Sequence, residues 1–455
     1  IAKGALELPG IFEEPRLALD QLSTEAQWKR SGDRMELQLR KLQFANADAQ
    51  GQAEVSWRTG EAPAAGPTRS RAAGPDPRFP GVIDLQGSLS RGDGSRVHRY
   101  LPLVLDQEVR HYVRDAVLQG QVSDVKFKVA GPLAQLPFAN PAQGEFQVSA
   151  KVRNGQFVYV PKSLQPPGAA PWPALSELKG ELVFKRAALE VHGVSGKIAG
   201  LPGLQLLKAS ARIPDLMHQA TVAVELDAQG ALGDALGFVN TSPLAGMTEQ
   251  ALAQATASGH AAYRFGLSLP IHAIETSRVE GSITLPGNDV KFSPDAPLLA
   301  GLKGTVTLNE RGFAVAAAQA RLLGGEVRID GGTRAAPAGA KDAVAGVEFR
   351  GQGQVSAEGL RQARELGLLS RLGQHASGST AYSASLLFRR GVPEISVSSS
   401  LQGLALHLPA PLAKAAEAAL PVRFDNALVS ASLAPGKALQ DQLSLSIGRL
   451  ASASY

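Results

Sequence analysis

The stretch EFQVSAKV, residues 145–152, decides the fold of this chain. Its apolar residues, Phe146, Val148, Ala150 and Val152, alternate with polar ones. Successive residues of a β-strand point to opposite faces, so the stretch predicts a strand with one dry face and one wet face. A wet face argues against a doubly wound parallel sheet, because the strands of such a sheet are buried on both sides.

The same period-two alternation recurs from one end of the chain to the other. Each run predicts a further strand whose apolar residues share one face, so the chain as a whole is expected to be mainly β. The apolar residues that we single out in these runs are Met35, Leu37, Leu39, Val125, Phe127, Val129, Phe146, Val148, Val152, Leu182, Phe184, Val222, Val224, Leu226, Phe265, Leu267, Leu269, Val306, Leu308, Val327, Ile329, Leu386, Phe388, Leu443, Leu445 and Ile447.

Turn signals separate several of these runs. Residues 153–156 read Arg-Asn-Gly-Gln, and Asn-Gly between alternating runs is a strong signal for a type I′ hairpin turn. Residues 286–289 read Pro-Gly-Asn-Asp, and residues 309–312 read Asn-Glu-Arg-Gly. We therefore predict hairpins at these three places and an antiparallel meander of consecutive strands.

Helical patterns are sparse. Residues 106–118 have the periodicity of an amphipathic helix. Residues 233–257 predict two short helical pieces broken near Pro243, and residues 358–372 predict another helix. An Ala-rich segment at 411–420 predicts a last, short one.

Composition excludes several kinds of site. The 455 residues include no cysteine, which rules out disulfides, thiolate metal ligands and cysteine nucleophiles. Lys and Arg (46) barely exceed Asp and Glu (41) and are scattered among them, so no nucleic-acid-binding surface is predicted. No run approaches the roughly 18 consecutive apolar residues that span a bilayer. Because the chain starts at Ile1, we expect any targeting or anchoring segment to lie outside it.

Motifs for catalysis and metal binding are missing. None of the eight histidines has metal-ligand spacing to another, and the Gly351-Gln352-Gly353 stretch lacks the third glycine of a dinucleotide-binding loop. We therefore predict no catalytic residue, no metal site and no cofactor. An enzyme would need a cluster of polar groups that the sequence does not reveal.

A long unit recurs along the chain. Residues 178–200 run from Leu-Lys-Gly through two alternating stretches to Gly-Lys-Ile-Ala-Gly, and residues 302–331 follow the same plan. A looser copy covers residues 22–55. Repetition of one strand-rich unit predicts an extended, quasi-continuous sheet.

Short segments spread over nearly the whole chain carry a family resemblance. They read Gly-Ala-Leu-Glu-Leu-Pro at 4–9, Arg-Tyr-Leu-Pro at 99–102, Gly-Pro-Leu at 131–133, Trp-Pro-Ala-Leu at 172–175 and Leu-Gln-Gly-Leu at 401–404. In these segments and their order the chain resembles the YhdP branch of the AsmA-like family, large proteins of Gram-negative bacteria.

The resemblance implies a fold and a function. It implies a long antiparallel sheet curled into an elongated apolar groove, a repeating β-groove, with a few short amphipathic helices. The apolar residues named above would line the groove, and phospholipid acyl chains would be the partner. The chain would be a non-enzymatic periplasmic conduit between the inner and outer membranes that supports the outer-membrane permeability barrier. A segment outside this chain would anchor it in the inner membrane.

On this basis the chain divides into six expected segments. The division is a β-groove repeat at 1–60, a flexible loop or linker at 61–80, strands with the helix 106–118 at 81–143, a repeat with the helical insert 233–257 at 144–280, a repeat with the helix 358–372 at 281–400, and a partial repeat at 401–455.

Two other interpretations stay open. Alternating apolar residues form the core of an ordinary two-sheet sandwich in most β proteins. A structural periplasmic scaffold could also bind protein partners through its sheet edges. An open cross-section lined with apolar side chains would favour the groove, and a closed, filled one the sandwich.

Overall fold

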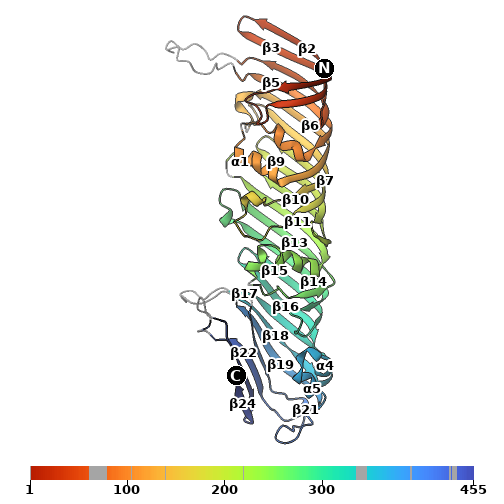
Figure 1. Ribbon diagram of the computed structural model, residues 1–455, viewed down its shortest axis with the longest axis vertical. Helices are drawn as coiled ribbons and strands as arrows, with labels where there is room; N and C mark the ends of the chain where they lie inside the picture. Colours follow the sequence, from red (N-terminus) through yellow and green to blue (C-terminus); the bar gives the residue numbers. More distant parts are fainter. Residues whose placement is uncertain are drawn as a thin grey trace.

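A computed structural model describes residues 2–60, 79–103, 105–138, 140–218, 220–248, 250–334, 346–389, 392–429, 432 and 438–455. Most of the expected linker 61–80 lies outside the described residues. The described strands form one elongated, ladder-like stack, with the N-terminal strands at one end and the C-terminal strands at the other (Figure 1).

Nearly every strand pairs with the next strand along the chain, and every pairing is antiparallel, as for β6 with β7 and β14 with β15. The exceptions are two three-residue strands, since β12 pairs with β14 and β21 with β19. The predicted mainly β fold with one large antiparallel sheet is therefore confirmed. The strands are β1 Ala2–Glu7, β2 Arg16–Ser31, β3 Arg34–Ala45, β4 Ala49–Arg58, β5 Val82–Asp93, β6 Val117–Pro132, β7 Glu145–Phe157, β8 Leu175–Lys185, β9 Ala188–Ile198, β10 Leu201–Ile213, β11 Thr221–Ala231, β12 Thr256–Ser258, β13 His260–Pro270, β14 Arg278–Lys291, β15 Leu299–Asn309, β16 Gly312–Leu322, β17 Gly325–Arg334, β18 Gly346–Ser356, β19 Ala376–Arg389, β20 Val392–Ser399, β21 Leu404–Leu406, β22 Val422–Leu428, β23 Asp441–Ile447 and β24 Ala451–Ser454.

Two of the three predicted hairpins are wrong. Residues 153–156 lie inside β7, where Asn154 has a φ of 52° and the pairing with β8 shifts between Val152 and Gly155. Residues 286–289 lie inside β14, where Gly287 has a φ of 145° and the pairing with β15 also shifts. Both are β-bulges with a residue of positive φ, a conformation that a type I′ hairpin turn also uses. The third prediction is confirmed, because β15 ends at Asn309 and β16 starts at Gly312.

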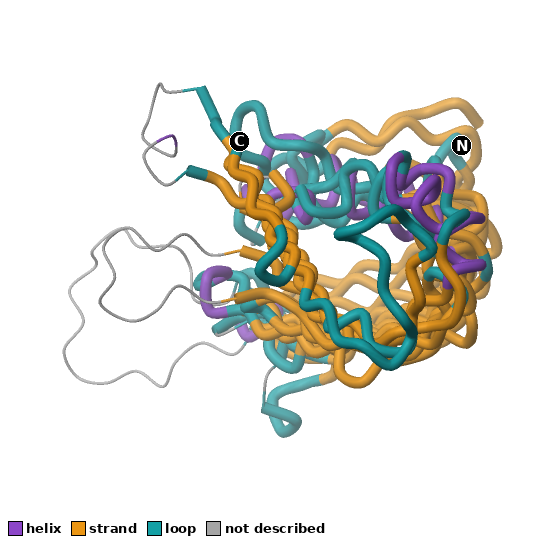
Figure 2. The backbone as a smooth tube through the Cα atoms, turned by 90° about the horizontal axis from the view of Figure 1, so that it is seen from below, coloured by secondary structure: helices purple, strands orange, loops and turns teal. Residues whose placement is uncertain are grey.

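Bulges of this kind recur across the sheet and curl it. Lys41, Asp124, Glu177 and Ala317 have φ values of 51–52° within register shifts. A bulge bends its strand and increases the local twist. A view along the long axis shows the strands curving around a centre, with most of the helical segments along one side (Figure 2).

The strands of the curled sheet begin and end along two long sides, here called edges, and the connections at these two edges differ. Because consecutive strands run in opposite directions, their connections alternate between the edges. One edge, here the hairpin edge, carries short links such as 32–33, 186–187 and 310–311. The other, the helix edge, carries every α-helix of the described part of the chain. These helices are α1 Gln107–Ala116, α2 Leu232–Asn240, α3 Leu244–Met247, α4 Ala357–Gln362 and α5 Leu368–Gly373.

Three of the four predicted helical regions are confirmed with changed limits. The helix expected at 106–118 is α1, and the region 233–257 holds α2 and α3, broken at Pro243 as predicted, but ends in β12. The region 358–372 is split because Gly367 has a φ of 54°, outside the helical range.

The helix predicted at 411–420 is wrong. The backbone of this segment hydrogen-bonds to β21 instead, with Lys414 and Leu406 exchanging amide-to-carbonyl bonds of 3.1 and 2.9 Å. A further bond of 2.7 Å runs from the Gly403 amide to the Ala416 carbonyl. Pairing with the sheet outweighs the local helix propensity of alanine.

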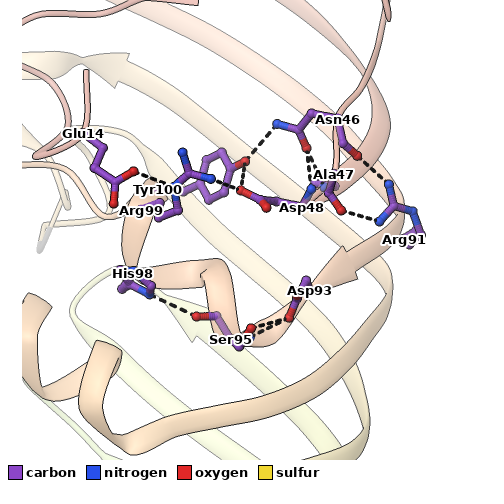
Figure 3. Close-up of polar contacts among 11 residues, drawn as sticks. Glu14, Asn46, Ala47, Asp48, Arg91, Asp93, Ser95, His98, Arg99 and Tyr100 are labelled. Carbon is purple, nitrogen blue, oxygen red and sulfur yellow. Dashed lines mark hydrogen bonds and ion pairs between the residues drawn. The ribbon is translucent and has the colours of Figure 1, made fainter. Parts of the chain in front are cut away.

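A buried ion pair holds the N-terminal end of the helix edge together (Figure 3). Asp48, in the turn between β3 and β4, is only 7% exposed. Arg99 Nη1 donates to Asp48 Oδ2 at 2.5 Å, and the Tyr100 hydroxyl donates to the same oxygen at 3.0 Å. Arg99 Nε also donates to Glu14 Oε2, at 2.8 Å, from the connection between β1 and β2. Three neighbouring connections of the helix edge, which follow β1, β3 and β5, are thereby tied at one point.

Aromatic side chains continue the helix edge from α1 to α2. The Tyr112 hydroxyl of α1 donates to the Tyr159 carbonyl at 3.2 Å. The Tyr159 ring lies 6.0 Å from that of Trp172, which lies 6.4 Å from Phe238 of α2. The helix edge is therefore a packed strip and not a row of independent loops.

Candidate functional site: the apolar face of the curled sheet

Strand pairing places the predicted apolar residues on one continuous face. Residues directly opposite each other in an antiparallel pair project to the same side of the sheet. Phe127 is opposite Val148, and Val148 is opposite Phe184 on the next strand. Farther along, Leu226 is opposite Phe265. The same tracing, strand by strand, brings every residue singled out in the sequence to this side, which we call the apolar face.

The tracing also finds members of the apolar face that the sequence reading did not single out. Leu85 lies between Val55 and Val129, and Ile283 is opposite Val306. Phe349 is opposite Leu386. The same apolar–polar alternation in the sequence could have identified these residues, but glycines and bulges interrupt it near them. As a lining for a ligand, all of these residues remain a prediction.

Much of the apolar face is only half-buried. On β11, Val222, Val224 and Leu226 are half-buried, whereas Ala223 and Glu225 on the opposite face are exposed. At the two ends of the sheet, Met35 is 36% exposed and Leu445 is 39% exposed. In a sandwich a second sheet about 10 Å away would bury this face. The 24 strands of the described residues belong to one sheet, so the sandwich interpretation is wrong for this part of the chain.

Helices cover the apolar face along the helix edge. Leu232 and Phe238 of α2 pack against a cluster that includes Leu204, Tyr263 and Leu285, all near the helix-edge ends of their strands. Toward the hairpin edge, Leu267 and Leu269 are half-buried and lie outside this helix-packed cluster of the described residues. The apolar face therefore has a helix-covered strip along the helix edge and, beside it, a half-buried strip, here called the free strip.

Glycines allow large rings to lie low on the apolar face. A Cβ on Gly281 would lie 2.5 Å from Phe265 Cδ1, and a Cβ on Gly87 would lie 2.4 Å from Phe127 Cζ. Phe349 covers Gly331 in the same way, at 2.7 Å. Such pairing of an aromatic ring with a cross-strand glycine is a known device in sheets. The rings lie over the neighbouring strand instead of standing up from the face.

Two tyrosines place polar atoms within this apolar surface. The hydroxyls of Tyr263 and Tyr382 are buried and find no hydrogen-bond partner among the described residues. Burial raises the pKa of Tyr263 to about 12 and that of Tyr382 to about 12. Both side chains therefore stay neutral at physiological pH and keep a hydrogen-bond donor available.

The opposite face is polar and has two shallow hollows. One, of about 830 Å³, is lined mainly by a row that includes Gln352, Ser383, Ser398 and Arg423. The other, of about 790 Å³, includes Gln52 and Ser88. Because these polar residues lie on the side away from the apolar face, neither hollow is the predicted groove.

Within the described ranges, no group of three or more histidine, aspartate or glutamate side chains could hold a metal ion. No helix of that part of the chain is long and apolar enough to cross a membrane.

Comparison with known proteins identifies the family. The family model described as YhdP protein matches residues 2–454. The chain belongs to the YhdP family. It is 25% identical over 362 residues to the intermembrane phospholipid transporter YhdP of Escherichia coli (strain K12). The match covers 77% of this chain and 26% of that protein, so the chain spans about a quarter of the length of its YhdP relative. No solved structure matches. The family predicted from the short segments along the sequence is thus confirmed.

Proposed function

We propose that this chain is one section of a conduit for phospholipids in the periplasm, between the inner and outer membranes. The single observation that carries the proposal is the free strip, the half-buried part of the apolar face, whose residues are opposite one another from strand to strand. Acyl chains would complete its cover. The name of the Escherichia coli relative supports phospholipid as the cargo.

The physical chemistry of the free strip suits movement along it. Burying a methylene group is worth about 0.8 kcal/mol and has no directional requirement. An acyl chain can therefore shift from one strand to the next and exchange one set of valine and leucine contacts for a similar one. The headgroup would stay in water at the open side. This function requires no catalytic residue, and we propose that the chain is not an enzyme.

A conduit between two membranes must also contact each membrane. We propose that segments outside it anchor the protein to the inner membrane and reach the outer membrane. Phospholipid supply to the outer membrane would in turn support its permeability barrier.

Site-specific photocrosslinking in cells tests the proposal. In the full-length protein, a photoreactive residue at Leu226 or Phe265 on the apolar face should crosslink phospholipid. The matched control is Glu225, which neighbours Leu226 on β11 but is exposed on the polar face. Equal lipid labelling at Leu226 and Glu225, or none at any position, would reject the conduit.

The scaffold interpretation gives a different pattern. A protein that binds partners through its sheet edges would crosslink other proteins at edge strands such as β24, whose four residues are all exposed. Its function would tolerate charges on the apolar face. Lipid labelling on the apolar face would therefore favour the conduit over the scaffold.

A further inference from the structure

The apolar face is not open along its whole length, because two connections from the helix edge cross to the hairpin edge. Phe292 follows β14 in the first of them, the connection 292–298. Its ring lies 5.1 Å from that of Phe349 and 6.4 Å from that of Phe388. Phe349 is near the start of β18 and Phe388 near the end of β19, so both lie at the hairpin edge.

The second crossing reinforces the first. Ala251, between α3 and β12, is 3% exposed and packs in one cluster with Val347 and Phe388. Val347 is fully buried and Phe388 is 7% exposed. Phe313 joins the cluster from β16, with its ring 6.1 Å from Phe349. Side chains from both edges therefore meet over β16–β19 and bury this part of the apolar face, whereas the apolar residues of β11 are half-buried.

We infer that Phe292, Phe349, Phe388 and Ala251 form a constriction that every acyl chain must open in order to pass from β13 toward β20. This inference rests on the proposed conduit. Aromatic pairs of this kind attract each other weakly, beyond the burial of their apolar area. We therefore expect the constriction to slow passage and to open by movement of the two connections.

The constriction would also control the passage of lipid along the conduit. Phe292, whose side chain is half-buried, and Ala251 are the parts of the constriction carried by connections, whereas Phe349 and Phe388 are fixed in paired strands. Opening therefore requires the two connections to move together away from the paired strands, so that fixing one of them keeps the constriction closed. In this movement Phe292 leaves the two fixed rings. The alkyl chain that replaces it would make apolar contacts with the same partners.

A reversible lock tests this inference. The chain has no cysteine, so the double substitution Ala251→Cys and Val347→Cys introduces the only pair available for a disulfide in this chain. Photoreactive residues at Leu226 and Leu445 report on the two sides of the constriction. In the oxidised protein, phospholipid should crosslink as before on the side from which it enters. The position on the other side should lose at least nine-tenths of its lipid labelling. Reduction should restore it.

A single substitution provides the second arm. Phe292→Ala should speed the arrival of newly labelled phospholipid at the far position about fivefold, corresponding to about 1 kcal/mol of barrier. Phe292→Leu keeps part of the apolar bulk, so its rate of lipid arrival should lie between those of the unmodified protein and Phe292→Ala. Trp172→Ala is the matched control, because the Trp172 ring packs at the helix edge, against the rings of Tyr159 and Phe238. Circular dichroism checks that each variant is folded.

The outcomes separate the two hypotheses. Lipid on both sides of the oxidised pair, together with an unchanged arrival rate in Phe292→Ala, overturns the constriction and leaves the conduit intact. Lipid on neither side in the unmodified protein overturns the conduit itself. Loss of labelling on one side only, reversed by reduction, establishes the constriction.

Discussion

Replacing Val148 with aspartate is expected to reduce phospholipid transport about 100-fold while the sheet still folds. Val148 lies on the apolar face between Phe127 and Phe184 on the neighbouring strands. It is half-buried, so a carboxylate there can be hydrated when no lipid is present. A passing acyl chain would strip that water, at a cost of about 3 kcal/mol for a charge in an apolar environment. Since 1.4 kcal/mol is a factor of ten, transport should fall by about two orders of magnitude.

The adjacent residue provides the control for this substitution. Gln147 is exposed on the polar face, opposite Lys128 on β6 and Lys185 on β8. Gln147→Asp adds the same charge beside two lysines and should leave transport unchanged. The measurement is the transfer of labelled phospholipid to the outer membrane in cells that express each full-length variant. Normal transfer by Val148→Asp at normal protein abundance would show that lipid does not travel along this face.

Replacing Arg99 with methionine is expected to destabilise the N-terminal end of the helix edge by about 3 kcal/mol. Asp48 is buried, and Arg99 is its only cationic partner among the described residues. Removing one member of a buried ion pair leaves an uncompensated charge, which costs about 3–5 kcal/mol. The lower value applies here because the Tyr100 hydroxyl still donates to Asp48.

Amide hydrogen exchange measures this effect locally. Exchange in the turn between β3 and β4 and in the 3₁₀ helix Gly94–Tyr100 should become about 100-fold faster in Arg99→Met. Lys41→Met is the control, because the Lys41–Glu25 pair is exposed and such pairs contribute at most about 1 kcal/mol. The double variant Arg99→Met, Asp48→Asn should recover most of the loss. Similar exchange in Arg99→Met and Lys41→Met would show that the buried pair does not hold this region.

The sequence was sufficient to predict the strands with one apolar face and the first helix of this fold. Alternation around Val148 or Leu226 depends only on the two-residue period of a strand, and the structure places all such residues on one face. The helix over 106–118 follows from its own periodicity. Family segments such as Arg-Tyr-Leu-Pro at 99–102 pointed to the assignment that the comparison confirms.

Other features depend on contacts that no local pattern specifies. Asn154 and Gly155 suit both a hairpin and a bulge, and pairing with β8 selects the bulge. Arg99 and Asp48 are 51 residues apart in the chain. Phe292 meets Phe349 only because a series of bulges curls the sheet and brings its two edges together. The constriction therefore could not be predicted from the sequence, in which Phe292 is one apolar residue of a connection.

Native mass spectrometry of the full-length protein, released gently from cells, tests the central claim most directly. We expect phospholipid bound to the unmodified protein and to Gln147→Asp, and a clear loss of bound lipid in Val148→Asp. A mass equal to that of the polypeptide alone in the unmodified protein would contradict the claim that acyl chains cover the apolar face.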